Sequence, residues 1–197
     1  LFHNIVMDVL QVLEVVVKEL SFLQRQESHK MKLKIISILA FFLVAQIGNA
    51  QESLNEVLKK HHKSDIPYIS ATELRMQQSK NEVIILDSRE LQEYKVSHIE
   101  SAISVGFDVF SMENIFKFVK NKETPIVIYC TLGIRSEMIA AQLKKAGYKD
   151  VKSLYGGICE WKNKEYKVID STQQKTNNIH TYSKQWSRWL LNGNPIY

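Results

Sequence analysis

The chain has 197 residues, of which 45% are hydrophobic and 24% are charged, so it can build a core of ordinary size and is not globally disordered. Its formal net charge is +5, but the lysines are spread along the sequence and form no basic stripe with interleaved aromatic residues, so we expect no nucleic-acid partner. The two cysteines are too few for a disulfide framework, and without a CxxC pair they indicate no metal site.

Residues 31–50 have the features of a secretory signal peptide. Two lysines lie near the start of this segment, residues 35–44 form a short apolar run, and Gly48 and Ala50 are small residues of the kind that signal peptidase requires. The apolar run is shorter than the ~20 residues that span a bilayer. Because a signal peptide stands at the N-terminus of its protein, we expect residues 1–30 to be a non-native upstream extension. We expect the mature protein to be exported, periplasmic or secreted, with no stable membrane insertion. An uncleaved membrane anchor is the alternative.

The rest of the chain divides into an N-terminal flank at residues 51–66, a domain at residues 67–165 and a C-terminal tail at residues 166–197. In the domain, short β-branched runs alternate with segments of helical periodicity. The predicted strands cover residues 68–69, 83–86, 102–105, 126–129 and 151–154, and the predicted helices cover residues 70–79, 90–96, 112–120, 136–146 and 158–163. This alternation predicts an α/β fold with a central parallel sheet of about five strands and helices on both faces.

The flank and the tail are less regular. Residues 51–64 are interpreted as a leading helix or a linker, and the polar residues 167–178 as a loop. Among residues 181–191, four side chains suit a helix with an aromatic stripe: Tyr182, Trp186, Trp189 and Leu190. We expect this stripe to pack on the domain itself, because tryptophans left in water would form an unusual apolar patch. A contact with a partner is the alternative.

Cys130 lies at the carboxyl end of the most strand-like run, before a tight loop that opens a helix. Open α/β sheets bind ligands at this end of their strands. Gly133 allows an unusual backbone conformation in the loop, so that loop amides and the helix dipole can converge on the sulfur and favour the thiolate. Arg135 adds a permanent positive charge. We therefore predict that Cys130 is a catalytic nucleophile; a structural buried cysteine is the alternative.

The loop and the first residues of the following helix are the predicted substrate- and anion-binding segment. Its members are Thr131, Leu132, Gly133, Ile134, Arg135 and Ser136.

Three motifs resemble the rhodanese-like domain family. The segment Cys130-x-x-Gly133-x-Arg135-Ser136 is similar to the active-site loop of rhodanese-like sulfurtransferases. Residues 86–102 resemble the family's Asp-x-Arg and His-Ile-x-Gly-Ala segments, and residues 155–161 resemble its Gly-Gly-x-x-x-Trp segment. The motifs come in the family's order, so the resemblance implies a rhodanese fold over about half of the chain.

The resemblance also implies a sulfurtransferase. In the implied reaction, the Cys130 thiolate takes a sulfur atom from a donor such as thiosulfate, holds it as a persulfide and passes it to a thiol acceptor. The implied partners are a small sulfur donor and a thiol or protein acceptor, and neither cofactor nor metal is implied. A sulfur- or redox-sensing or protein-binding module without turnover is the alternative. A cysteine phosphatase fits less well, because such enzymes place five residues between Cys and Arg and this chain has four.

Four other residues of these motifs are given lesser roles. Asp87 and Arg89 are expected to support the site as a structural brace, without taking part in the chemistry. His98 is interpreted as a hydrogen-bonded turn residue. Cys159 is interpreted as a small buried helix residue, and a reversible disulfide with Cys130 is the alternative.

Overall fold

The computed structural model describes residues 14–22, 24–26, 29–32, 34, 37, 52–62 and 64–197. The chain divides into two compact units, Leu1–Gln51 and Glu52–Tyr197. The described residues of the first unit are helical. Within the described part of the chain, no helix combines the length and the apolar character needed to cross a membrane. Most of the predicted signal peptide at residues 31–50 lies outside the described residues, so it stays a prediction.

The second unit is built around a five-stranded parallel sheet with the strand order β1-β6-β5-β2-β4. The strands are β1 (Tyr68–Ile69), β2 (Ile84–Asp87), β4 (Ile103–Ser104), β5 (Ile126–Tyr129) and β6 (Val151–Leu154). Each lies within one residue of its predicted bounds. The predicted α/β fold class is therefore confirmed.

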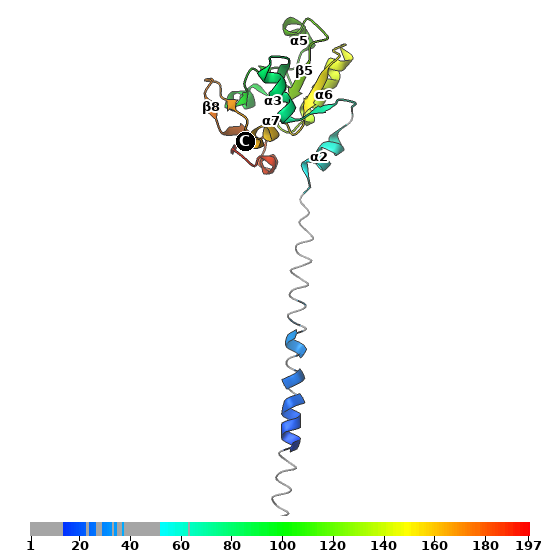
Figure 1. Cartoon of the computed structure of the whole chain (residues 1–197), viewed down its shortest axis with the longest axis vertical. Coiled ribbons are helices and arrows are strands. Elements are labelled where there is room, and N and C mark those ends of the chain that lie inside the picture. Colours follow the sequence, from blue (N-terminus) through cyan, green and yellow to red (C-terminus); the bar gives the residue numbers. More distant parts are fainter. Residues whose placement is uncertain are drawn as a thin grey trace, which may run out of the picture. The chain divides into compact units, whose positions relative to one another are not determined.

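This unit contains six α-helices, and α2, α3, α5, α6 and α7 are labelled in Figure 1. They are α2 (Leu54–His61), α3 (Ala71–Ser79), α4 (Leu91–Val96), α5 (Met112–Phe118), α6 (Ile134–Lys145) and α7 (Gly157–Asn163). The N-terminal flank thus contains a helix, which begins at a capping box of Ser53 and Glu56. A second capping box, of Ser70 and Glu73, opens α3, which lies within the predicted helix at residues 70–79.

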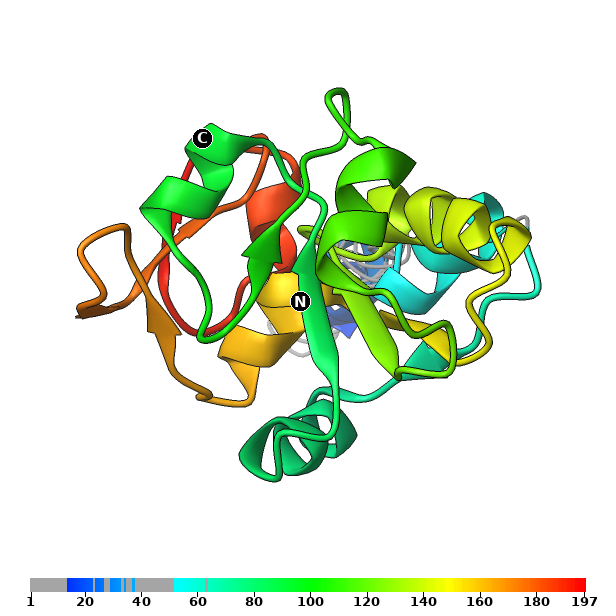
Figure 2. The same cartoon turned by 90° about the horizontal axis from the view of Figure 1, so that it is seen from above.

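Each face of the sheet carries its own hydrophobic core, because alternate side chains of a strand point to opposite faces. On the central strand β5, Val127 and Tyr129 join the core that contains α3 and α7, whereas Ile126 and Ile128 join the core that contains α5 and α6. Figure 2 shows this division, with α6 on one side of the sheet and α7, together with the orange and red C-terminal segment, on the other. The sheet is therefore covered on both faces.

The tail differs from its prediction in two places. The predicted loop at residues 167–178 is wrong, because β7 (Val168–Ile169) and β8 (Lys175–Thr176) pair there as an antiparallel hairpin. Strand β3 (His98–Ile99) adds to β7, so His98 lies on a strand and not in a turn.

The predicted helix at residues 181–191 is also wrong. Only one 3₁₀ turn, Trp186–Trp189, forms between β9 (Asn178–His180) and β10 (Asn194–Ile196), which pair in parallel. The backbone of Tyr182 is left-handed, with φ of 67°, and this conformation stops a helix at that residue. The expected packing on the domain is confirmed for three of the large side chains, which contact the core on the α7 face while partly buried: Trp186, Trp189 and Leu190.

Candidate functional site

Cys130 follows the last residue of β5 and is completely buried. The backbone N–H of Gly133 donates a hydrogen bond to its Sγ atom over 3.1 Å, and the Ser136 Oγ atom lies 3.7 Å from the same sulfur. Gly133 is the N-cap of α6 and has φ of 125°, a conformation that disfavours any side chain with a Cβ atom. The local sequence therefore folds as predicted: a strand, a glycine turn and a helix that begins beside the thiol.

The Gly-Gly turn before α7 closes the other side of this loop. The backbone N–H of Ile158 donates to the carbonyl of Cys130 over 2.9 Å, and the N–H of Cys159 donates to the carbonyl of Thr131 over 3.3 Å. A Cβ atom on Gly157 would lie 2.3 Å from the Cys130 carbonyl oxygen, so this close approach requires glycine. The two motifs, far apart in the sequence, are thus one structural unit around the sulfur.

Arg135 does not present a free positive charge to a substrate, contrary to the expectation. Its two terminal nitrogens lie 2.7 Å from the two carboxylate oxygens of Glu93 on α4, and Nη2 also donates to the Thr131 Oγ atom over 3.0 Å. Both members of the ion pair are largely buried. The net charge beside the cysteine is therefore smaller than Arg135 alone implies.

Glu93 is the residue of this site to which the sequence assigned no role. Burial alone would raise the pKa of its carboxyl group, but the hydrogen bonds and charge of Arg135, together with the amide of Glu90, lower the pKa below its usual value. Its only sequence signal is its place in the stretch that resembles the family's motif. Nothing local to Glu93 shows that it reaches a loop about forty residues further along the chain.

The remaining residues of the predicted anion-binding segment have structural contacts. Leu132 is part of the core on the α7 face, so its side chain lines no binding surface. The Ser136 Oγ atom is hydrogen-bonded to the carbonyl oxygen of Gly133 at 3.0 Å and to the Ser153 Oγ atom at 2.9 Å. Ile134 begins α6. The contacts to the sulfur therefore come from Gly133 and Ser136.

Asp87 and Arg89 form a brace beneath the loop. Their side chains are completely buried, and Arg89 Nη2 lies 2.7 Å from Asp87 Oδ2 and 2.6 Å from the carbonyl oxygen of Ser97. Asp87 ends β2, next to Tyr129 on β5. The pair thus links the carboxyl ends of the central strands to the turn before β3, as a supporting role requires.

Cys159 lies on α7, and burial raises the pKa of its thiol to about 12. Both cysteines are free thiols in the structure. At neutral pH Cys159 is therefore a protonated, unreactive thiol, in line with the interpretation as a small buried helix residue.

Helix α2 of the flank covers the loop. Leu58 on this helix is buried, with a methyl group 3.4 Å from the point where a Cβ atom on Gly133 would lie. The chain after α2 is held by Glu137 on α6, whose carboxylate accepts hydrogen bonds from Ser64 and Tyr68 and contacts His62 Nδ1 at 2.8 Å. Access to the sulfur from this side therefore requires α2 to move.

The tail borders the site from another direction. The guanidinium carbon of Arg135 lies 5.0 Å from the ring centroid of Tyr182, and His180 Nδ1 lies 3.8 Å from a carboxylate oxygen of Glu93. Burial is the main cause that lowers the pKa of His180; the charge of Glu93 opposes it, and the charges of Arg89 and Arg135 add to it. At neutral pH His180 is therefore an uncharged neighbour of the ion pair.

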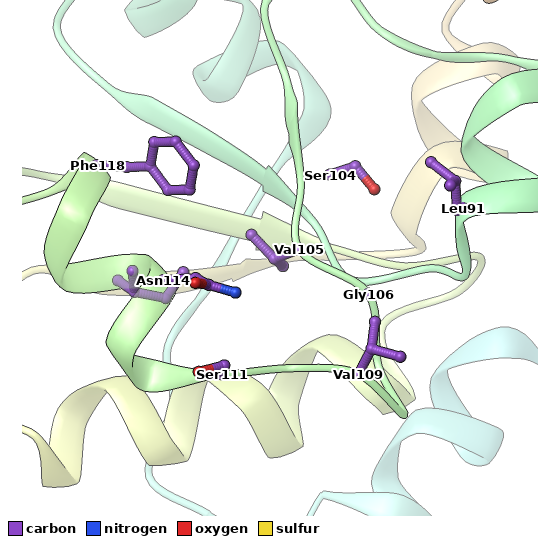
Figure 3. Close-up of a pocket in the computed structure, with 9 residues that line it drawn as sticks. Leu91, Ser104, Val105, Gly106, Val109, Ser111, Asn114 and Phe118 are labelled. Carbon is purple, nitrogen blue, oxygen red and sulfur yellow. The ribbon is translucent and has the colours of Figure 1, made fainter.

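A pocket of about 510 Å³ opens beyond the end of β4 (Figure 3). The pocket is lined by Leu91 of α4, by Val105 and Val109 of the loop after β4, and by Asn114 and Phe118 of α5. Its lining is mostly apolar, and none of the predicted site residues contributes to it. We assign no function to this pocket.

The family model of the rhodanese-like domain matches residues 70–164. These residues are a rhodanese-like domain. A thiosulfate sulfurtransferase from Pseudomonas aeruginosa has a similar fold, with a TM-score of 0.50 and 22% identity over 64% of this chain and 23% of that protein. At this identity the likeness concerns the fold alone. The match to the family model confirms the family that the sequence motifs imply.

Curated relatives of this rhodanese-like domain have another activity in their names. A protein of Buchnera aphidicola subsp. Baizongia pistaciae is 39% identical over 98 residues, which are 48% of this chain and 31% of the relative. A protein of Escherichia coli O139:H28 is 35% identical over 101 residues, which are 49% of this chain and 29% of the relative. Both are named tRNA uridine(34) hydroxylase. The chain thus spans about 30% of the length of these relatives.

These relatives overturn two expectations. Their name describes hydroxylation of a tRNA nucleoside, so the interpretation as an exported sulfurtransferase that moves sulfur through a Cys130 persulfide is wrong. The expectation of a small sulfur donor and a thiol acceptor, with no nucleic-acid partner, is wrong for the same reason. The expectation of an enzyme is confirmed at the level of the rhodanese-like family, without the sulfurtransferase class. The motifs led to the wrong activity because they describe the loop around the thiol and do not specify the substrate that reacts with it.

Proposed function

We propose that this chain modifies a uridine in RNA, as a hydroxylase with Cys130 as its nucleophile. The observation that carries the proposal is the identity of 35–39% to proteins named tRNA uridine(34) hydroxylase. The formal net charge of +5 favours association with a polyanion. Because the chain spans only about 30% of those relatives, the proposal assigns the chemistry of the thiol to this part of such an enzyme.

The site suits an uncharged reacting group better than a small dianion. Arg135 is committed to Glu93, and the other side chains of the loop are uncharged, so little unpaired positive charge remains for thiosulfate or phosphate. A uracil ring is neutral at physiological pH and has an electrophilic C6 atom, because its C5–C6 double bond is conjugated with a carbonyl group. The Gly133 amide, 3.1 Å from the sulfur, stabilises the thiolate that would attack this carbon.

The chemistry that fits these groups is a transient covalent addition. The thiolate of Cys130 forms an S–C6 bond and moves an electron pair to C5, which becomes nucleophilic. Attack of C5 on an oxidant of the peroxide class forms a C–O bond and breaks the O–O bond, and the released hydroxide takes up a proton as water. Loss of the C5 proton and cleavage of the S–C6 bond restore the ring and the thiolate. The base is oxidised by two electrons and the peroxide is reduced.

The experiment is expression of the full chain in a bacterial strain that lacks its own tRNA uridine(34) hydroxylase, followed by mass spectrometry of nucleosides from purified tRNA. We expect the wild-type chain to produce a uridine that has gained one oxygen atom, and Cys130→Ser to produce none. Cys159→Ala is the matched control, because it removes the other thiol and should retain the product. Unmodified tRNA in cells that contain soluble, folded wild-type protein would overturn the proposal.

A further inference from the structure

An exposed tyrosine of the tail and its partly buried tryptophan neighbour lie next to the candidate site. Tyr182 is 56% exposed. Its ring centroid lies 5.1 Å from that of Trp186, and the two ring planes are 41° apart. Both residues lie beyond residues 70–164, so the family match does not account for them. Trp186 is anchored because it also contacts the core on the α7 face.

The backbone holds the Tyr182 ring in this place at a cost. Its φ of 67° is unfavourable for a bulky residue and persists only where the surroundings enforce it. The amide of Tyr182 donates to His180 Nδ1 over 3.2 Å, and the neighbouring amide of Thr181 donates to the carbonyl of Ile196 over 2.8 Å. Strand β10 therefore fixes the turn that presents the ring, and core packing does not explain why an exposed ring is held there.

The ring also lies beside Arg135, in the first turn of the helix that follows the loop of the predicted nucleophile. The guanidinium carbon of Arg135 lies 5.0 Å from the Tyr182 centroid, and Arg135 is bonded to Thr131, the residue after Cys130. Arg135 Nε is buried and has no hydrogen-bond partner among the described residues. Because Glu93 binds the terminal nitrogens, the guanidinium is held rigidly beside the ring.

We infer that Tyr182 and Trp186 form a stacking platform for a nucleobase of the RNA substrate, beside the Cys130 loop. The inference rests on the proposed function and names its base-binding surface. Aromatic rings and arginine planes are the groups on which proteins stack bases of single-stranded RNA loops. Lys184, two residues after Tyr182, is exposed and supplies a cation for the phosphate attached to such a base. An acidic peptide would use the cation but has no flat ring to match the platform.

The test measures binding of a synthetic RNA hairpin with one uridine in its loop to the full chain, by quenching of tryptophan fluorescence and by filter binding. Tyr182→Asn removes the ring, and asparagine adopts the left-handed backbone more readily than other residues. We expect this variant to bind the hairpin roughly tenfold or more weakly, because stacking contributes ~1–3 kcal/mol per base. Tyr182→Phe retains the ring and should bind within about twofold of wild type. Phe118→Ala, which removes an exposed ring on α5, is the matched control and should bind like wild type.

The outcomes separate this inference from the proposed function. If Tyr182→Asn binds the hairpin and modifies tRNA as wild type does, the platform is wrong and the hydroxylase proposal stands. If Tyr182→Asn loses binding but the wild-type chain adds no oxygen to tRNA, the platform is supported and the hydroxylase proposal fails. If the wild-type chain binds an acidic peptide and not the hairpin, the platform for a nucleobase is overturned.

Discussion

Both terminal nitrogens of Arg135 lie 2.7 Å from the carboxylate of Glu93, so that α6 and α4 are joined by a bidentate ion pair beside the cysteine. Such fork-to-fork geometry fixes orientation as well as distance. The ring of Tyr182 and the Thr131 hydroxyl contact the same guanidinium. Three separate segments of the chain therefore meet at one side chain, and its partner Glu93 determines where that side chain lies.

Removal of the Glu93 carboxylate should destabilise the protein. Glu93→Ala leaves the largely buried Arg135 cation without its partner, and loss of one member of a buried pair costs about 3–5 kcal/mol. Urea unfolding of wild type and variant at pH 7 measures the difference. Lys117→Ala breaks an exposed ion pair with Glu113 on α5 and should change the free energy of unfolding by less than about 1 kcal/mol. Equal losses in the two variants would contradict this role of Glu93.

The effect of Glu93 should depend on pH in one direction. Its pKa is lowered in the folded protein, so its contribution is present above the unfolded pKa of about 4.3 and is lost as the pH falls through the folded value. The difference between wild type and Glu93→Ala should therefore be constant from about pH 6 to 7 and shrink in acid. Urea unfolding over a series of pH values measures this. A difference that grows below pH 4 would show that the sign is wrong.

The buried pair of Asp87 and Arg89 should respond differently to one and to two substitutions. Asp87→Leu alone leaves a completely buried arginine unpaired and should cost about 3–5 kcal/mol of unfolding free energy. Asp87→Leu combined with Arg89→Met removes both charges and should recover a large part of that loss. The measurement is a double-mutant cycle by urea unfolding. Additive losses would mean that the two side chains do not act as a pair.

Trimming the side chain that covers the loop should expose the buried thiol. Leu58→Ala removes the methyl groups that lie over Gly133, so Cys130 should react faster with iodoacetamide, by about tenfold if opening is favoured by about 1.4 kcal/mol. Peptide mass spectrometry measures the rate for each cysteine. Cys159 is the internal control, since burial raises the pKa of its thiol to about 12. Unchanged labelling of Cys130 would show that α2 does not control access.

The close approach at the Gly-Gly turn gives a fifth prediction. Gly157→Ala places a Cβ atom 2.3 Å from the carbonyl oxygen of Cys130 on a backbone with φ of 55°, so we expect loss of more than about 3 kcal/mol or failure to fold. Gly147→Ala is the comparison, because Gly147 also has a positive φ, of 96°, but its Cβ would meet only the flexible side chain of Lys122 at 3.3 Å. Thermal unfolding should show a clearly smaller effect there. Similar melting temperatures for the two variants would contradict the close approach.

The sheet and the thiol loop were predictable because their signals are local. The run Ile126–Tyr129 is β-branched and apolar, Gly133 follows it at a fixed distance, and a helical pattern begins at once. Each of these features constrains neighbouring residues, so this strand, its turn and its helix follow one another in space as they do in the sequence. The placement of Cys130 at the carboxyl end of β5 needed no further information.

The tail and the partner of Arg135 were not predictable because their contacts are not local. Strands β7 and β8 have two residues each, too few to show a period, and they form only because β3 lies beside them. Tyr182 has the spacing of a helical residue but takes a left-handed conformation that the parallel pairing of β9 and β10 enforces. Glu93 and Arg135 are 42 residues apart in the sequence and meet through the tertiary fold. The activity was mistaken for a related reason: the loop motif describes the nucleophile and leaves its substrate open.

The contacts of the flank and tail mean that the family boundaries are not the boundaries of a soluble fragment. Residues 70–164 match the family, but Leu54 and the side chains of Trp186, Trp189 and Leu190 pack on their core from outside that range. A truncated protein cut at residues 70 and 164 would expose this apolar surface to water and would be prone to aggregation. Production of the domain for crystallisation or for fusion to another protein should therefore retain everything from Glu52 to Tyr197.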